Sequence, residues 1–423
     1  MDNKRIINLL KKNAITYVHR ICFLNPDESV AFEIPQSDII IDSISYSENL
    51  QNGERRTLSF KLFNGTGKYL PSVNSQKGYY TIYYDKNNIY NNIYQKNNNY
   101  IKYPLWGVTK FSYEIGIKIN NTDYVWFPKG IFILSSADAV QKMSQKEISL
   151  SLKDKYSLFN GRSGKLLTAI EIPSGSNGCQ VIKDLLNEDF GNGYTFDTKE
   201  PIFDLSLLDF EIQASIKKDS GNTMGNIIED VALQMNAEFY YNENGNFVLT
   251  PINDTFVDSE KPLCWEYSDV NGDLFDVQNQ YNFEEAINII NVVGANIENG
   301  LYKALAVNND SRSPICVGNI GKRYGDPVTD ANVWSDTLAL DTARYYLRKN
   351  SIKCITTNLI GKLNPFIELN KLVAVNHNFF DLKHELFVVN SISFSGDSLE
   401  MSIGTTNIQT LTFLKAGDCG YVY

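Results

Sequence analysis

Residues that could carry out chemistry are few in this chain of 423 residues, and they are widely spaced. The only histidines are His19, His377 and His384. The last two lie on either side of an apparent turn with Asp381 and Glu385, and such side chains can bind zinc. Neither His-x-x-x-His nor His-Glu-x-x-His spacing is present, so we expect exposed loop histidines and no metal site.

Candidate nucleophiles lack the sequence context that would activate them. The segment GRSGK at 161–165 has neither the elbow spacing of a serine hydrolase nor the spaced glycines of a phosphate-binding loop. Cys179 follows GSNG and could open a helix, where the pKa of a thiol falls, but a buried structural cysteine is the simpler interpretation. The six cysteines include no Cys-x-x-Cys pair, so neither a zinc site nor a disulfide framework is predicted.

Neighbouring carboxylates could in principle cleave a glycoside, as in Glu229–Asp230 and Glu284–Glu285. Acidic pairs are too common to identify such a site without geometry. We therefore predict no catalytic residue, no cofactor and no metal ion, and we expect that the chain is not an enzyme.

Length and charge restrict the class of protein. A chain of 423 residues exceeds the roughly 250 to 300 residues at which one hydrophobic core stops growing, so two or more domains are expected. The formal charge of −10 argues against a general binder of nucleic acids or anionic membranes, and no sequence-specific nucleic-acid partner is expected. There is no secretory signal pattern and no run of about 18 apolar residues, so we expect folding in a cytoplasm without stable membrane insertion.

Two similar strings near the ends of the chain indicate the elements that must position its residues: DSISYS at 42–47 and NSISFS at 390–395. In both, serines alternate with larger residues, as in a strand with one buried face. The predicted inward residues are Ile40, Asp42, Ile44 and Tyr46 in the first and Val388, Asn390, Ile392 and Phe394 in the second. The predicted outward residues are Ser43, Ser45 and Ser47 in the first and Ser391, Ser393 and Ser395 in the second.

Each string is followed by a turn and a second alternating strand, so each is predicted to open a β-hairpin. The turns are Asn52-Gly53 and Gly396-Asp397. We interpret the two hairpins as equivalent elements of a duplicated unit. A third, weaker echo occupies residues 132–154, and chance similarity explains it about equally well.

The segment between the two strings has α/β character. Helices are expected within 178–190 and 220–237, followed by a hairpin at Asn244-Gly245. A further helix is expected at 335–350 with Ser335 as its N-cap. Residues 78–103 are rich in Asn and Tyr, which indicates a long surface loop or, alternatively, a loop that contacts a partner.

The ordered set of segments resembles the baseplate hub proteins of bacteriophage tails and related contractile particles. The likeness spans roughly residues 35–408. It rests on the segments IIIDSISYSENLQNGERRTLSFKL, YPLWGVTK, WFPKGIFILSS, EISLSLKDKYSLFNGRSGKLL, TMGNIIEDVALQMNAEFYYNENGNFVLTPI, ARYYLRKN, NPFIELNKLVAV and FVVNSISFSGDSLEMSIG.

The resemblance implies a mainly β fold with α+β insertions, in which two similar tube-type antiparallel β-barrels flank a small α/β middle domain. The expected divisions are an N-terminal extension at 1–34, a first barrel at 35–160 with the loop 78–103, a middle domain at 161–260, a second barrel at 261–408 with an inserted helix at 335–350, and a C-terminal tail at 409–423.

The resemblance also implies a structural role. A homotrimer with two barrels in each chain would form a pseudo-hexameric ring that adapts a six-fold tail tube to a three-fold spike or fibre. The implied partners are the tail tube or distal tail protein on one side, the spike or tail fibre protein on the other, and the tape measure protein. The implied location is the baseplate of the virion tail, assembled in the host bacterial cytoplasm, with the six serines lining the lumen or a polar seam.

Three alternatives stay open at this point. The first is a distal tail protein that forms a true hexamer from one barrel per chain. The second is a peptidoglycan-cleaving tail enzyme. The third is a carbohydrate-binding module that would use Trp106 or Trp126.

Overall fold

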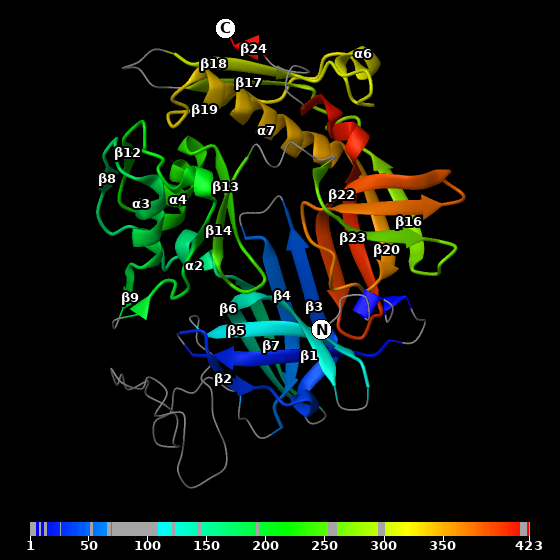
Figure 1. The fold of residues 1–423 in the computed structure, drawn as a ribbon. Helices are drawn as coiled ribbons and strands as arrows, with labels where there is room; N and C mark the ends of the chain where they lie inside the picture. The colour runs from blue at the N-terminus through cyan, green and yellow to red at the C-terminus, as the bar shows by residue number, and fades with distance from the viewer. Residues whose placement is uncertain are drawn as a thin grey trace.

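The computed structural model describes residues 6–7, 10–11, 15–25, 27–50, 54–65, 69, 109–120, 123–142, 145–191, 194–252, 260–294, 301–414 and 421–422 (Figure 1). The expected fold class is confirmed, because strands account for 47% and helices for 18% of the structure. The Asn/Tyr-rich segment 78–103, the turn at Asn52-Gly53 and Trp106 lie outside the described residues. No helix in the described ranges is both long and apolar enough to span a membrane.

One large sheet runs through the described part of the molecule. Its 13 strands follow the order β16-β20-β23-β22-β3-β4-β7-β6-β5-β1-β2, and β21 joins β22 while carrying β15 on its other side. The strands are β1 (Tyr17–Leu24), β2 (Val30–Glu33), β3 (Ile39–Asn49), β4 (Arg56–Phe63), β5 (Lys110–Lys118), β6 (Tyr124–Lys142), β7 (Gln145–Asp154), β15 (Leu263–Ser268), β16 (Leu274–Tyr281), β20 (Ile355–Lys362), β21 (Leu372–His377), β22 (Leu382–Ser395) and β23 (Glu400–Asn407).

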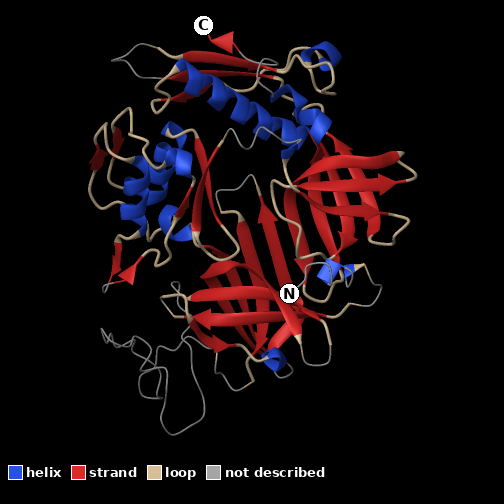
Figure 2. Ribbon diagram, in the orientation of Figure 1, coloured by secondary structure: helices blue, strands red, loops and turns tan. Residues whose placement is uncertain are grey.

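The sheet bends into two barrel-like halves that meet where β22 pairs with β3 (Figure 2). The first half contains β1 to β7, and the second contains β15, β16 and β20 to β23. A single hydrophobic cluster includes buried residues of both halves, among them Phe111 and Phe132 of the first and Leu359 and Ile403 of the second. The two halves are therefore joined by a shared core as well as by the sheet.

The two halves repeat one strand order. In chain order, β3, β4, β5, β6 and β7 of the first half correspond to β16, β20, β21, β22 and β23 of the second. Within the sheet, β3-β4-β7-β6-β5 and β16-β20-β23-β22-β21 then run in the same sequence. The same topology thus occurs twice in one chain.

The positions of the bulges repeat as well. Pairing of β6 with β7 shifts register between Leu134 and Ser136, and pairing of β22 with β23 shifts between Val389 and Ser391. When the two bulges are aligned, the segment FILSS at 132–136 corresponds to FVVNS at 387–391. The weak third echo at 132–154 is therefore the counterpart of the C-terminal string region.

The N-terminal segment differs from expectation. β1 and β2 lie within residues 1–34, which we expected to be an extension outside the first barrel. Instead, β1 pairs with β5 over its whole length, and β2 pairs with β1. The reason is that Ile21 and Phe23 are almost completely buried in the core, so this segment is part of the first half.

The middle α/β unit follows the first half in the chain. Its elements are α2 (Ser157–Asn160), β8 (Ile170–Ile172), α3 (Gly178–Leu186), β9 (Asp189–Gly191), β10 (Tyr194–Thr195), β11 (Ile202–Phe203), η3 (Leu205–Leu207), β12 (Ile216–Lys218), α4 (Met224–Gln234), β13 (Ala237–Tyr241) and β14 (Phe247–Pro251). Thr223 and Asn226 form a capping box at the start of α4, and Asn177 caps α3. Both predicted helices and the hairpin at Asn244-Gly245 are confirmed.

A second small α/β layer covers one end of the molecule (Figure 1). It contains β17 (Ile289–Gly294), β18 (Lys303–Val307), α6 (Val317–Ile320), β19 (Val328–Asp330), α7 (Asp336–Cys354), η5 (Ile408–Leu414) and β24 (Tyr421–Val422). Ser335 caps α7, as predicted, but the helix continues to Cys354 because its apolar stripe packs beneath β17 and β18. In the expected C-terminal tail, β24 pairs with β18.

Candidate assembly surface at the seam between the two halves

The two serine strings are neighbours in the structure. β3 and β22 pair antiparallel, with Ser47 opposite Ser393 and Tyr46 opposite Phe394. The rings of Tyr46 and Phe394 stack with their centroids 4.9 Å apart and are buried in the shared core. We call this pair of strands the seam. The interpretation of the two strings as equivalent hairpins is wrong, because β3 and β22 are partners and β3 corresponds to β16.

Four of the six predicted serines meet on the exposed face of the seam. Ser47 lies opposite Ser393, and Ser45 lies opposite Ser395. Ser45 and Ser393 are exposed, whereas Ser47 and Ser395 are half-buried. The Ser47 hydroxyl also shares a hydrogen bond of 2.7 Å with the hydroxyl of Thr57 on β4. The strand alternation predicted from the sequence therefore holds across the centre of the seam.

Ser43 has a different position from the one expected. The β3–β4 pairing shifts register between Ile40 and Ser45, so Ser43 lies in a bulge. Its hydroxyl donates to the Ile40 carbonyl and accepts from the Lys61 amide at 2.8 Å. Ser43 thus replaces a missing backbone partner in the bulge.

The same bulge changes which residues of β3 face the core. Ile39 and Ile44 are buried, whereas Asp42 is exposed and Ile40 is only half-buried. The expectation that Ile40 and Asp42 face inward is wrong, because the extra residues of the bulge interrupt the two-residue alternation.

A second bulge affects β22. Val389 and Ile392 pack in the shared core, while Val388 packs against the layer that contains α7. The predicted inward set that joined Val388 to Ile392 is wrong, because the bulge at Asn390 reverses the direction of the side chains before it. Ser391, just after this bulge, lies over Gly404, where an added Cβ would come within 2.2 Å of the serine hydroxyl oxygen.

Hydroxyl groups continue from the seam across both halves of the sheet. Ser45 lies opposite Ser59, which lies opposite Ser151, which in turn lies opposite Ser136. On the other side, Ser393 lies opposite Ser402. We call this surface the hydroxyl face; it comprises Ser45, Ser47, Thr57, Ser59, Ser136, Ser151, Ser393, Ser395 and Ser402.

Two lysines on the hydroxyl face of the first half form ion pairs. Lys61 lies 3.6 Å from Glu147, and Lys153 lies 2.8 Å from Glu54. Such exposed ion pairs contribute little stability, but they cancel the local charge. These two lysines therefore add little net positive charge to the hydroxyl face.

His19 supports the seam from β1, and no sequence pattern identified this role. Its side chain is 2% exposed, with Nε2 at 2.8 Å from the Gly396 carbonyl oxygen and Nδ1 at 2.8 Å from the Tyr113 hydroxyl. Because a carbonyl oxygen can only accept, Nε2 carries the proton and Nδ1 accepts from Tyr113. Burial lowers the pKa of His19, and the hydrogen bond to Gly396 opposes that shift only in part.

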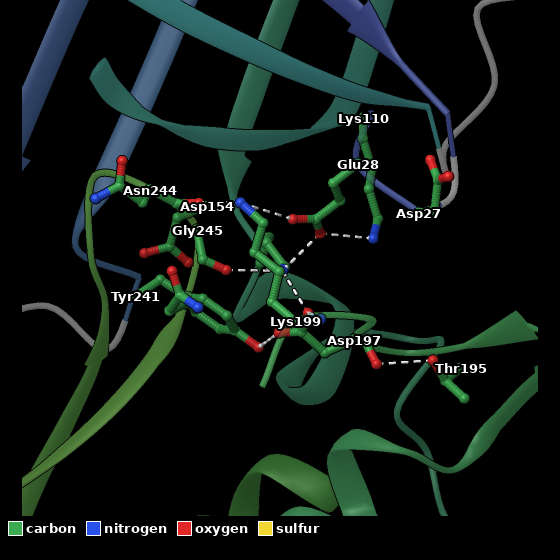
Figure 3. Close-up of polar contacts among 12 residues, drawn as sticks. Asp27, Glu28, Lys110, Asp154, Thr195, Asp197, Lys199, Tyr241, Asn244 and Gly245 are labelled. Atoms are coloured by element: carbon green, nitrogen blue, oxygen red, sulfur yellow. Dashed lines mark hydrogen bonds and ion pairs between the residues drawn. The ribbon is translucent and has the colours of Figure 1, made fainter. Parts of the chain in front are cut away.

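A buried charge cluster holds the middle unit against the first half (Figure 3). The Lys155 ammonium, which is fully buried, lies 2.6 Å from a carboxylate oxygen of Glu28 and 2.6 Å from one of Asp197. Lys110 reaches the same Glu28 oxygen at 2.8 Å, and the Tyr241 hydroxyl donates to Asp197 at 2.9 Å. These five residues come from β5, β13 and segments next to β2, β7 and β10, so no local motif predicts the cluster.

The pKa shifts in the cluster reflect burial and charge. Burial favours the neutral form of Glu28, but the ammonium groups of Lys155 and Lys110 outweigh it and hold the pKa of Glu28 below its usual value. Burial and the neighbouring Lys155 lower the pKa of Lys110. The cluster therefore depends on all of its charges being present together.

Three other candidates for chemistry, Cys179, Asp230 and Trp126, have structural roles. Burial raises the pKa of Cys179 to about 11, so this thiol is not activated. Asp230 pairs with Lys218 at 2.7 Å, and the Arg20 guanidinium lies 4.2 Å above the Trp126 ring.

The described residues contain no cluster of three or more His, Cys, Asp or Glu side chains that could hold a metal ion. His377 and His384 both lie on the β21–β22 hairpin, where His384 Nδ1 is 3.2 Å from Glu266.

Comparison with known proteins identifies relatives of the fold. No protein-family model matches the sequence, and no curated protein sequence matches it. Among solved structures, the 43 kDa tail protein of prophage MuSo2 from Shewanella oneidensis is 12% identical, with a TM-score of 0.54 over 93% of this chain and 99% of that one. The tail protein from Neisseria meningitidis MC58 is 10% identical, with a TM-score of 0.56 over 92% of this chain and 96% of that one. The chain therefore has the fold of these two tail proteins, one of which comes from a prophage.

Proposed function

We propose that this chain is a structural hub of a phage tail baseplate or of a related particle. In this proposal it forms a homotrimer whose duplicated halves create a pseudo-hexameric ring. The ring would join a six-fold tail tube or distal tail protein to a three-fold spike or tail fibre, and the tape measure protein would contact it during assembly. The likeness to two tail proteins supports the general role in a virion tail.

The observation that carries the proposal is the duplication of one topology within the chain. An adaptor between six-fold and three-fold partners must offer six similar units with only three-fold symmetry. A trimer of a duplicated chain meets this requirement, because three copies supply six similar halves. The repeated strand order and the repeated bulges after Leu134 and Val389 support this equivalence.

In the proposed ring, the hydroxyl face lines the lumen. Serine and threonine hydroxyls keep such a surface hydrated, while the paired lysines offer little net positive charge to DNA phosphates. DNA could then pass through the ring without being retained. This role requires no catalytic residue, and the proposed protein is structural and not an enzyme.

The test is the mass and shape of the purified protein. Native mass spectrometry should give three times the chain mass of 47.9 kDa, and projections in the electron microscope should show a three-fold outline with six inner barrels. A stable hexamer would contradict the hub and favour a distal tail protein. Cell-wall lysis by the purified chain in a zymogram would contradict the structural role.

A further inference from the structure

The seam within one chain gives a template for contacts between chains. On one side of β22, the residues up to Val388 pair with β21, and Ser391 to Ser395 extend beyond it. This extension pairs with the second part of β3, from Ser45 to Asn49. The seam therefore joins the extended end of one long strand to the first strand of the neighbouring half.

The counterparts of these two strands have no such partner in the described part of the chain. β6 corresponds to β22, and its pairing with the β5 side ends at Leu134, whose amide donates to the Thr109 carbonyl, so no described strand lies on the side of residues 136–140 that faces away from β7. β16 corresponds to β3, and it pairs only with β20 among the described strands. Both open edges are exposed, with Val140 37% and Tyr281 58% accessible.

We propose that the open edge of β6 in one chain pairs antiparallel with the open edge of β16 in a second copy of this chain. The inference rests on the proposed trimer and names the surfaces that hold it together. Each chain carries one edge of each kind, so the contact is head-to-tail and can close into a ring.

The repeated ladder sets the register of this contact. Ser59 and Asn358 lie opposite the equivalent residues Ser151 and Gly404, so they are equivalent to each other. Ser45 lies opposite Ser59, and Gln278 lies opposite Asn358, so Gln278 takes the place of Ser45. Transferring the seam register gives the pairs Ser136–Asn282, Ala137–Tyr281, Asp138–Gln280, Ala139–Asn279 and Val140–Gln278.

The chemistry of the two edges fits an assembly interface. An open strand edge is a template for pairing with another chain, and polar residues keep it soluble until a partner arrives. The β16 edge is polar at 278–280, and Asp138 meets no like charge because it lies opposite Gln280. Ala139 and Asn279 replace the stacked rings of Phe394 and Tyr46, so the contact between chains buries less apolar surface than the seam does. We therefore expect a trimer that dissociates on dilution while each chain stays folded.

Pairs of engineered cysteines test the register. One variant carries Ala139→Cys with Asn279→Cys, and another carries Asp138→Cys with Gln280→Cys. Neighbouring positions on antiparallel strands alternate between sites with Cα atoms about 5.5 and 4.5 Å apart, both within disulfide range. Mild oxidation should produce covalent dimers and closed trimers on a non-reducing gel for at least one variant.

Three controls make the result specific. Ala139→Cys with Tyr281→Cys shifts the register by two residues and should give little cross-linking. Ser47→Cys with Ser393→Cys should close a bond inside one chain and create no new oligomer. The parent chain shows the background from its native cysteines. Hydrogen exchange of the parent is an independent measurement, because the amides at 136–140 and 278–282 that point away from β7 and β20 should be protected in the trimer and exchange after dilution.

The outcomes separate this inference from the proposed function. In-register cross-links within a trimer, together with the amide protection, support it. A trimer in which only the shifted pair cross-links, or in which these amides stay unprotected, overturns the edge pairing and leaves the hub standing. Open covalent polymers also overturn it. Absence of any trimer overturns both proposals.

Discussion

At the scale of single residues, the seam depends on side chains that satisfy particular backbone groups. His19 connects β1 to the end of the second serine string through the Gly396 carbonyl, and Tyr113 fixes the other side of the imidazole. Ser43 fills a gap in the β3–β4 ladder. These residues are important because a buried polar group without a partner costs about 1 to 3 kcal/mol.

Acidification should destabilise the protein partly through His19. Its pKa is lowered in the folded state, so the unfolded chain binds the proton more readily, and the stability that His19 contributes is complete above about pH 6.5 and is lost as the pH falls. His19→Gln should cost about 1 to 3 kcal/mol at pH 7 by disturbing the two hydrogen bonds. Urea unfolding at pH 7 and pH 5 should show a smaller gap between parent and variant at pH 5. An equal gap at both pH values would contradict this role.

At the scale of elements, bulges decide which side of each strand faces the core. The bulge in β3 is closely packed against the end of β22. The Gly396 amide donates to the Ile44 carbonyl at 2.9 Å, and an added Cβ at Gly396 would lie 2.5 Å from the Ile41 carbonyl oxygen. That oxygen belongs to the backbone and cannot move away easily. Gly396 is therefore required by the close approach of two elements.

Substitution of Gly396 should show how tightly these elements fit. Gly396→Ala should lower the free energy of unfolding by about 1 to 3 kcal/mol, because the new methyl group overlaps the backbone. Gly318→Ala is the matched control, since its added Cβ would meet nothing closer than Cys316 Sγ at 3.7 Å, and it should change stability by no more than about 0.5 kcal/mol. Denaturant midpoints measure both. Equal effects would mean that the bulge tolerates a side chain.

At the scale of the whole molecule, the buried charge cluster connects parts that are far apart in the chain. Glu28 and Lys110 belong to the first half, while Asp197 and Tyr241 belong to the middle unit, and Lys155 lies between them. Under the proposed function, the protein would have to transmit load between its ring and its other partners without separating these parts. The cluster, together with the packing around it, provides such a connection.

Removal of the central charge should loosen this connection. Lys155→Met leaves Glu28 and Asp197 buried without their shared counter-charge, and the expected cost is about 3 to 5 kcal/mol. Lys217→Met is the control, because Lys217 and Glu171 form an exposed pair at 3.1 Å, and it should cost no more than about 1 kcal/mol. Unfolding curves give the stabilities, and hydrogen exchange should rise in β13 and β14 of the Lys155 variant. Similar costs for the two variants would exclude the cluster as the main connection.

Local spacing was enough to predict much of the secondary structure. The cap residues Thr223 and Ser335 sit where free helix amides need acceptors, and Asn244-Gly245 forms the hairpin turn. Alternating serines indicated strands with one polar face, and four of them share the hydroxyl face. Each of these features depends on a few consecutive residues, so the sequence alone determined them, along with the mainly β class.

Only the tertiary structure decided which strands are partners and which are copies. DSISYS and NSISFS have similar sequences, and the two strands that contain them pair with each other at the seam. The structural counterpart of NSISFS is the segment 135–140, which has a bulge at the equivalent position but a different sequence. Bulges and pairing depend on the neighbouring strand, and a shift of one residue moves every side chain to the other face. The buried position of Lys155 was equally invisible, because a charge is stabilised in a core only by partners that the fold brings from distant parts of the chain.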